Sequence, residues 1–175
     1  MQHSQEKILE KLDYNGIIVD IAEWTETIWC GKIGYALNNT DEPDVDEIMT
    51  NYKRLSRSTA KGQFSPVRNA CISVNYLSTE RPNGVMFGAM VRTNEQPDGF
   101  DVLRIPPAKY MRILICDETA NALNKDPWHG GIPPYSWIYD LLAPHFCYKP
   151  GSDTLPILEY YANKLCYLYV PVEKA

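Results

Sequence analysis

The chain of 175 residues is long enough to bury a substantial hydrophobic core, so it needs no disulfide or metal ion for stability. Hydrophobic residues make up 45% of the sequence and charged residues 22%, which excludes a disordered or fibrous protein. The formal net charge is −5, and no stretch of the sequence concentrates Lys and Arg. This charge pattern argues against direct binding of nucleic acid.

The sequence contains no apolar run near the roughly 18 residues that a membrane-spanning helix requires. Residues 1–12 carry charges throughout, unlike a signal peptide. The five cysteines are odd in number, irregularly spaced and free of Cys-x-x-Cys pairs. We therefore expect a reduced, cytoplasmic protein that has no membrane partner, no metal site and no cofactor.

The first half of the chain predicts a short leading helix, then a strand, a helix and two strands, over residues 5–12, 17–24, 44–57, 70–77 and 85–92. Ile8, Leu9 and Leu12 would share one side of the leading helix. Asp44 and Glu47 form a capping-box-like start to the second helix, whose apolar residues recur at helical spacing. The turn-rich segment between the last two strands predicts a hairpin.

The same order recurs in the second half, as a strand, a helix and two strands over residues 110–116, 135–143, 155–161 and 165–170. A short helix is expected near residues 119–123, and Pro144 is expected to end the main helix. Two strand-helix-strand-strand units side by side would share one sheet and one core, which predicts an α+β fold. The expected organisation is a helical leader over 1–13 and one domain over 14–175, with repeats at about 14–95 and 101–172.

Four short segments of the second half follow one another in order along the chain: Ile105-Pro106-Pro107-Ala108-Lys109-Tyr110, Ser136-Trp137-Ile138, Glu159-Tyr160-Tyr161 and Tyr169-Val170-Pro171-Val172. Their order resembles that of the GyrI-like small-molecule-binding family. This family also forms the effector-binding domains of AraC/Rob-type and multidrug-sensing MerR-type transcription regulators. The resemblance covers about residues 14–172 and rests on pattern more than on motif in the first half.

The resemblance implies a curved antiparallel sheet with two main helices and a cleft at a pseudo-two-fold axis. About 13 residues precede the first expected strand of the domain, too few for a helix-turn-helix module, so we expect the stand-alone form. Many relatives carry a short His-x-Gly segment where this chain has the longer insert 117–131. Whether this insert covers the cleft as a lid is left open by the sequence.

Glu159 is the strongest candidate for a functional side chain. Period-two alternation places Glu159 and Tyr161 on one face of a strand, and Leu158 and Tyr160 on the other. A carboxylate among apolar neighbours needs a partner or a shifted pKa, whereas one at an exposed sheet edge needs neither. The resemblance implies that the ligand-contacting glutamate of the family lies at Glu159, with Tyr161 orienting its carboxylate or touching the ligand.

Six further aromatic residues are candidates for ligand contacts. Tyr110 and Trp137 match the motifs of the family, although a tryptophan in the middle of a helix also suits the core. Trp24 and Phe87 come from the first repeat, whose strands should face the second repeat across the cleft. Tyr76 and Trp128 complete the set, and Trp128 lies in the insert, from which it could close the cleft.

Three functions are compatible with these features. The first is capture of a lipophilic, cationic or planar small molecule by Glu159 and the aromatic side chains. The second is hydrolysis, because some stand-alone relatives open cyclopropane rings of DNA-alkylating compounds and thereby protect against toxins; Glu159 and Tyr161 would then be catalytic. The third is protein interaction, as in the gyrase inhibitors that give the family its name. The sequence leaves the ligand and the oligomeric state open.

Overall fold

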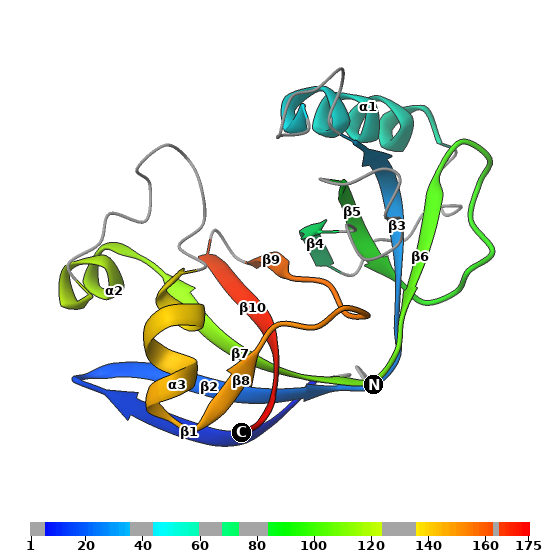
Figure 1. Cartoon of the computed structure of the whole chain (residues 1–175). Helices are drawn as coiled ribbons and strands as arrows, with labels where there is room; N and C mark the ends of the chain where they lie inside the picture. The colour runs from blue at the N-terminus through cyan, green and yellow to red at the C-terminus, as the bar shows by residue number, and fades with distance from the viewer. Residues whose placement is uncertain (1–5, 36–43, 60–67, 74–83, 124–135, 163–164) are drawn as a thin grey trace. The chain divides into compact units, whose positions relative to one another are not determined.

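Antiparallel strands make up most of the computed structural model, which describes residues 6–35, 44–59, 68–73, 84–123, 136–162 and 165–175. The chain divides into two compact units, residues 1–26 with 106–175 and residues 27–105. Each unit contains an antiparallel sheet and at least one helix, which confirms the predicted α+β class (Figure 1). The predicted boundaries of two sequence repeats stay a prediction.

The sheet of the first unit joins the beginning of the chain to its end. Its strands run in the order β1, β2, β7, β10 and β9, with β8 paired to β10. Their bounds are β1 (Glu6–Tyr14), β2 (Ile17–Trp24), β7 (Ala108–Ile115), β8 (Tyr148–Pro150), β9 (Leu158–Ala162) and β10 (Leu165–Lys174). The register places Asp20 of β2 opposite Arg112 of β7, and Tyr169 of β10 opposite the same arginine. Side chains far apart in the sequence therefore share one face.

Three helical segments pack on the other face of this sheet: α2 (Asp117–Ala122), the π-helix η3 (Trp137–Leu142) and α3 (Ala143–His145). Trp137, Ile138 and Leu142 are buried there. The core that they complete includes Ile17, Val19, Ile21, Met111, Ile113, Ile115, Leu168, Val170 and Val172. Every second residue of β2, β7 and β10 thus faces the helices, as period-two burial requires.

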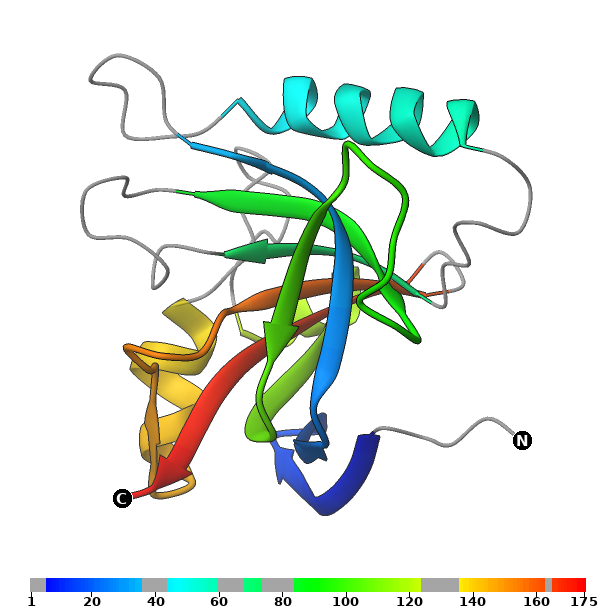
Figure 2. The same cartoon turned by 90° about the vertical axis from the view of Figure 1, so that its right-hand side faces the viewer.

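The second unit has the strand order β4, β5, β3 and β6. It contains β3 (Thr27–Gly34), α1 (Val45–Ser58), β4 (Arg68–Ser73), β5 (Val85–Val91) and β6 (Asp101–Ile105), and Figure 2 shows α1 and these strands from a second side. Asp44 caps α1 by accepting a hydrogen bond from the backbone N–H of Glu47 at 3.0 Å, as the capping-box pattern predicted. Ile48 and Tyr52 are its buried residues, so the predicted amphipathic helix is confirmed.

The predicted leading helix over residues 5–12 is wrong, since residues 6–14 form strand β1. Its side chains alternate between half-buried and exposed positions, which is the period of a strand. Asn15 and Gly16 have φ of 51° and 89° and connect Tyr14 to Ile17, which pairs directly with it. An Asn-Gly pair with two positive φ angles is the preferred two-residue hairpin turn, and this signal outweighs the spacing of the apolar residues.

The second main helix also differs from the prediction at its end. Pro144 does not end it, because the helical segment continues through His145. Its first part is a π-helix, in which the N–H of Ala143 bonds to the carbonyl of Ile138. Pro144 lies where the helix changes from π to α geometry. Because proline has no N–H, the helix lacks one backbone hydrogen bond at this point, yet it continues.

The predicted strands agree with the structure except at several bounds. β9 begins at Leu158 and not at residue 155, since Pro156 has no N–H for the ladder. The strand predicted over 70–77 is described as far as Ser73, and its remainder lies outside the described residues. The strands β3, β6 and β8 were not predicted, and β3 is as long as β2.

Candidate functional site

Strand β9 presents its residues alternately to the two faces of the sheet. Glu159 lies opposite Leu168, and Leu168 belongs to the core beneath the helices. Tyr160 lies opposite Tyr167 on the other face. The predicted separation of Glu159 and Tyr161 from Leu158 and Tyr160 therefore holds, and it assigns the carboxylate to the helix-covered face.

Glu159 and Tyr161 form a hydrogen-bonded pair on that face. The hydroxyl of Tyr161 donates to Oε2 of Glu159 at 2.5 Å, although the tyrosine side chain itself is 38% exposed. Glu159 is half-buried, and burial raises its pKa, while the hydrogen bond from Tyr161 opposes this rise in part. No cation pairs with this carboxylate in the described part of the chain. Its charged form is therefore only partly compensated.

Trp137 belongs to the same helix-side core, where it is 1% exposed. Its indole N–H is buried and has no hydrogen-bond partner in the described part of the chain. The predicted candidate Trp128 lies outside the described residues, as does Tyr76. The structure thus places Glu159, Tyr161 and Trp137 on one side of the sheet.

Trp24 and Tyr110 lie on the opposite face, where they contact Tyr160 and Tyr169. The ring of Trp24 lies 4.9 Å from that of Tyr169, 5.7 Å from Tyr110 and 6.1 Å from Tyr160. Tyr169 lies 5.9 Å from both other tyrosine rings. All four side chains are at most 3% exposed. We call these four residues the aromatic cluster, which lies on the face of the sheet opposite to Glu159.

A network of charges adjoins the aromatic cluster through the hydroxyl of Tyr169. This hydroxyl donates to Oε1 of Glu6 at 2.7 Å and accepts from Arg112 at 3.1 Å. Arg112 also bonds Glu6 at 3.0 Å and Asp20 at 2.8 Å, and Lys11 reaches Asp20 at 3.3 Å. Burial and the neighbouring Glu6 raise the pKa of Tyr169, so its phenol stays protonated. The network holds β1, β2, β7 and β10 together.

The sequence pointed to Trp24 and Tyr110 as ligand contacts, which stays a prediction, and did not point to Tyr160, Tyr169 or Arg112 as their neighbours. Tyr160 and Tyr169 belong to two of the sequence motifs described above, but only the register of the strands shows that they lie together. Phe87 belongs to the second unit, where its ring lies 5.2 Å from that of Tyr52, in an edge-to-face contact. Its predicted role in ligand binding stays a prediction.

Among the described residues, no group of three or more His, Cys, Asp and Glu side chains is arranged to hold a metal ion. In the same described residues, no helix has the length and apolar character needed to cross a membrane.

No protein-family model and no curated protein matches the sequence. Several solved structures are nevertheless similar in fold. An integron cassette protein from the mobile metagenome of Vibrio cholerae aligns over 89% of this chain and 95% of its own, with a TM-score of 0.53 and 13% identity. SAV2435 bound to tetraphenylphosphonium aligns over 94% of both chains, with a TM-score of 0.53 and 12% identity.

EcmrR, solved in a complex with DNA, aligns over 90% of this chain but only 57% of its own length, with a TM-score of 0.51 and 11% identity. At these identities the likeness concerns the fold alone. It agrees with the fold that the sequence motifs suggested. This chain therefore shares its fold with a protein solved with a bound organic cation and with part of a protein solved on DNA.

Proposed function

We propose that this chain binds small lipophilic cations and that Glu159 is the anionic group that selects them. The observation that carries the proposal is the half-buried carboxylate of Glu159, whose pKa is raised and whose hydrogen-bond partner is the hydroxyl of Tyr161. The likeness of fold to SAV2435, which was solved with tetraphenylphosphonium, supports it.

The chemistry of the pair suits an organic cation better than a hydrogen-bond donor. Tyr161 already supplies a strong hydrogen bond to the carboxylate, so what Glu159 still lacks is compensation of its charge. A phosphonium or quaternary ammonium ion has no N–H to donate and offers charge and apolar surface only. Its charge would stabilise the ionised carboxylate, and its apolar groups would contact aromatic rings such as that of Tyr161.

Trp137 stays a candidate for a ligand contact on this face, because it lies in the same core as Leu168, the residue opposite Glu159, although its own side chain is only 1% exposed. Trp24 and Tyr110 stay candidates for a ligand on the other face. The Glu159 proposal does not depend on them, since their rings are already packed within the aromatic cluster.

Calorimetric titration with tetraphenylphosphonium tests the proposal. We expect binding by the wild type, binding at least about tenfold weaker in Glu159→Gln, and unchanged binding in Glu173→Gln, which alters an exposed carboxylate on neighbouring β10. Affinity should fall as the pH is lowered through the raised pKa of Glu159, because protonation removes the charge. Equal affinity in the wild type and Glu159→Gln would refute the role of this carboxylate.

The same site could hydrolyse a bound compound, and mass spectrometry separates the two activities. The protein is incubated with a cyclopropane-bearing DNA-alkylating compound and the products are weighed. Recovery of the unchanged compound supports binding alone. A product heavier by one water that is lost in Glu159→Gln would instead identify a hydrolase, with Glu159 positioning or deprotonating the water.

A further inference from the structure

Helix α1 carries charges on its outer face that are separated along its length. The exposed residues Asp46, Glu47, Thr50, Lys53, Arg54, Arg57 and Ser58 form one stripe, opposite the buried Ile48 and Tyr52. Two carboxylates occupy the first turn of this stripe and three cations occupy its second half. We call these seven residues the α1 stripe.

The charged residues of the α1 stripe form no ion pair among the described residues. Opposite charges in a helix stabilise it when they are three or four residues apart. Here Asp46 and Lys53 are seven residues apart, as are Glu47 and Arg54, which is about 10 Å along the axis. Each pair lies on the same side of the helix but too far apart to meet.

The helix dipole accounts for part of this arrangement only. It favours acidic residues in the first turn and basic residues in the last turn, and its influence fades within one turn. Asp46, Glu47 and Arg57 fit that rule, and Arg57 is the basic residue of the last turn. Lys53 and Arg54 lie further inside the helix, where the dipole does not explain them.

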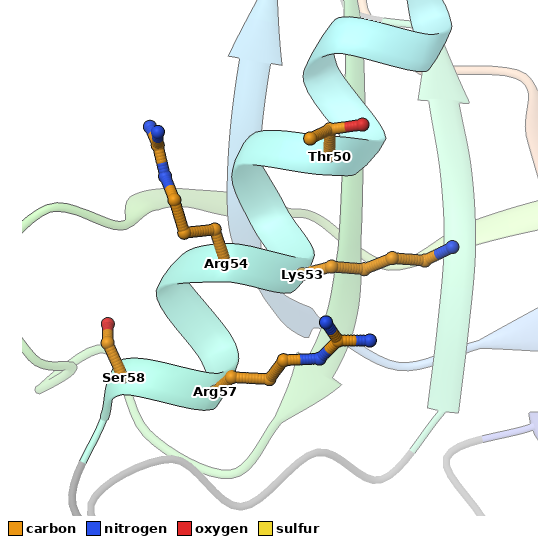
Figure 3. Close-up of a pocket in the computed structure, with 5 residues that line it drawn as sticks. All are labelled: Thr50, Lys53, Arg54, Arg57 and Ser58. Atoms are coloured by element: carbon orange, nitrogen blue, oxygen red, sulfur yellow. The ribbon is translucent and has the colours of Figure 1, made fainter.

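The basic half of the α1 stripe borders a surface depression of about 450 Å³. Figure 3 shows Lys53 and Arg57 extending to one side of the helix and Arg54 to the other. The cations are spread over both sides and do not converge on one point. This arrangement suits an elongated partner with charges at matching intervals better than a single small anion.

We propose that the α1 stripe is the contact surface for a second copy of this chain, with the two α1 helices antiparallel. The midpoints of the pairs Asp46–Arg54 and Glu47–Lys53 both fall at Thr50. A two-fold axis through Thr50 therefore places Asp46 of each copy opposite Arg54 of the other. It also places Glu47 opposite Lys53, so one surface complements itself with four intermolecular ion pairs, as an isologous dimer requires.

The small side chain at Thr50 lets the two helices approach at the axis, within the 8–10 Å of ordinary helix packing. Exposed ion pairs are individually weak and are screened by salt, so the dimer should be weak and strongly dependent on ionic strength. Sedimentation velocity over a range of concentrations tests this with the full chain. We expect a monomer–dimer equilibrium in 50 mM NaCl whose dissociation constant rises at least about tenfold in 500 mM NaCl.

Charge reversal gives a sharper test. The variant Lys53→Glu/Arg54→Glu and the variant Asp46→Lys/Glu47→Lys should each be monomeric, because like charges then face one another. An equimolar mixture of the two should form a heterodimer, and a chain carrying all four changes should form a homodimer again. Far-UV circular dichroism checks that each variant keeps α1.

A matched control is Lys149→Glu/Glu173→Lys, which reverses an exposed ion pair of the other unit and should leave sedimentation unchanged. A wild type that is monomeric under all conditions would overturn the proposal. So would a mixture of the two charge-reversed variants that stays monomeric. Retention of the wild type on a heparin column that is lost in Lys53→Glu/Arg54→Glu, with no dimer, would assign the basic half to a polyanion instead.

Discussion

Replacement of Arg112 by Met should remove the main link between the strands of the first unit. Met keeps most of the length of the side chain but removes its charge and its hydrogen bonds. Arg112 lies within 2.8 Å of Asp20 and 3.0 Å of Glu6, whose side chains are only 9% and 12% exposed. Without the guanidinium, two largely buried carboxylates would face the same space.

Breaking a buried ion pair by removing one partner costs about 3–5 kcal/mol. Lys11 still reaches Asp20 at 3.3 Å from an exposed position, so we expect a loss of unfolding free energy near the lower end, about 3 kcal/mol. For a chain of this size that corresponds to a fall of about 6–12 °C in melting temperature. Urea denaturation at pH 7 measures the loss directly.

Two further variants test the reasoning. The triple variant Arg112→Met/Glu6→Gln/Asp20→Asn removes the uncompensated charges, so it should recover part of the stability that Arg112→Met loses. Lys149→Met breaks an ion pair whose side chains are 72% and 69% exposed, and it should cost less than about 1 kcal/mol. A cost of Arg112→Met as small as that of Lys149→Met, or no recovery in the triple variant, would refute the argument.

Three other substitutions probe single features. The raised pKa of Glu159 means that the folded state binds more protons than the unfolded state above the ordinary carboxyl range, so wild-type stability should fall as pH rises there. Glu159→Gln should lack this fall and be at least as stable as the wild type at pH 7. If the urea midpoints of the two proteins change with pH in the same way from pH 4 to 7.5, the expectation is contradicted. Gly31→Ala should cost about 3 kcal/mol, because a Cβ atom there would overlap the carbonyl oxygen of Phe87. Gly16→Ala should cost only about 1 kcal/mol of unfolding free energy, because the space around Gly16 is open and only its φ of 89° disfavours a side chain. Equal urea midpoints for the two glycine variants would contradict this distinction.

Elements with a strong local period could be predicted from the sequence. The strand over 17–24 and the helix after Asp44 agree with the structure almost residue by residue, because each has one consistent period and a clear start. The prediction for strand β1 was wrong, although the turn that follows it is also a local feature of the sequence. The three apolar residues Ile8, Leu9 and Leu12 fit a helix, and the Asn-Gly turn that contradicts a helix follows only after Tyr14.

The arrangement of the candidate site depends on pairing over long distances in the sequence, which local patterns do not contain. Arg112 and Asp20 are 92 residues apart, and Tyr169 and Glu6 are 163 residues apart. Period-two alternation could assign Glu159 and Tyr160 to opposite faces of one strand. It could not tell which face the helices cover, so the division of the candidate residues between two faces came only from the structure.

Successive residues of β9 have different roles because they face opposite sides of the sheet. Tyr160 packs into the aromatic cluster, where contacts with Trp24 and Tyr169 fix the strand against its neighbours. Because the pairing has a period of two, the same register fixes Glu159 on the helix-covered face opposite Leu168. A shift by one residue would bury the carboxylate in the aromatic cluster, which is costly without a partner. The aromatic cluster therefore holds Glu159 in position for the proposed site without contributing a ring to it.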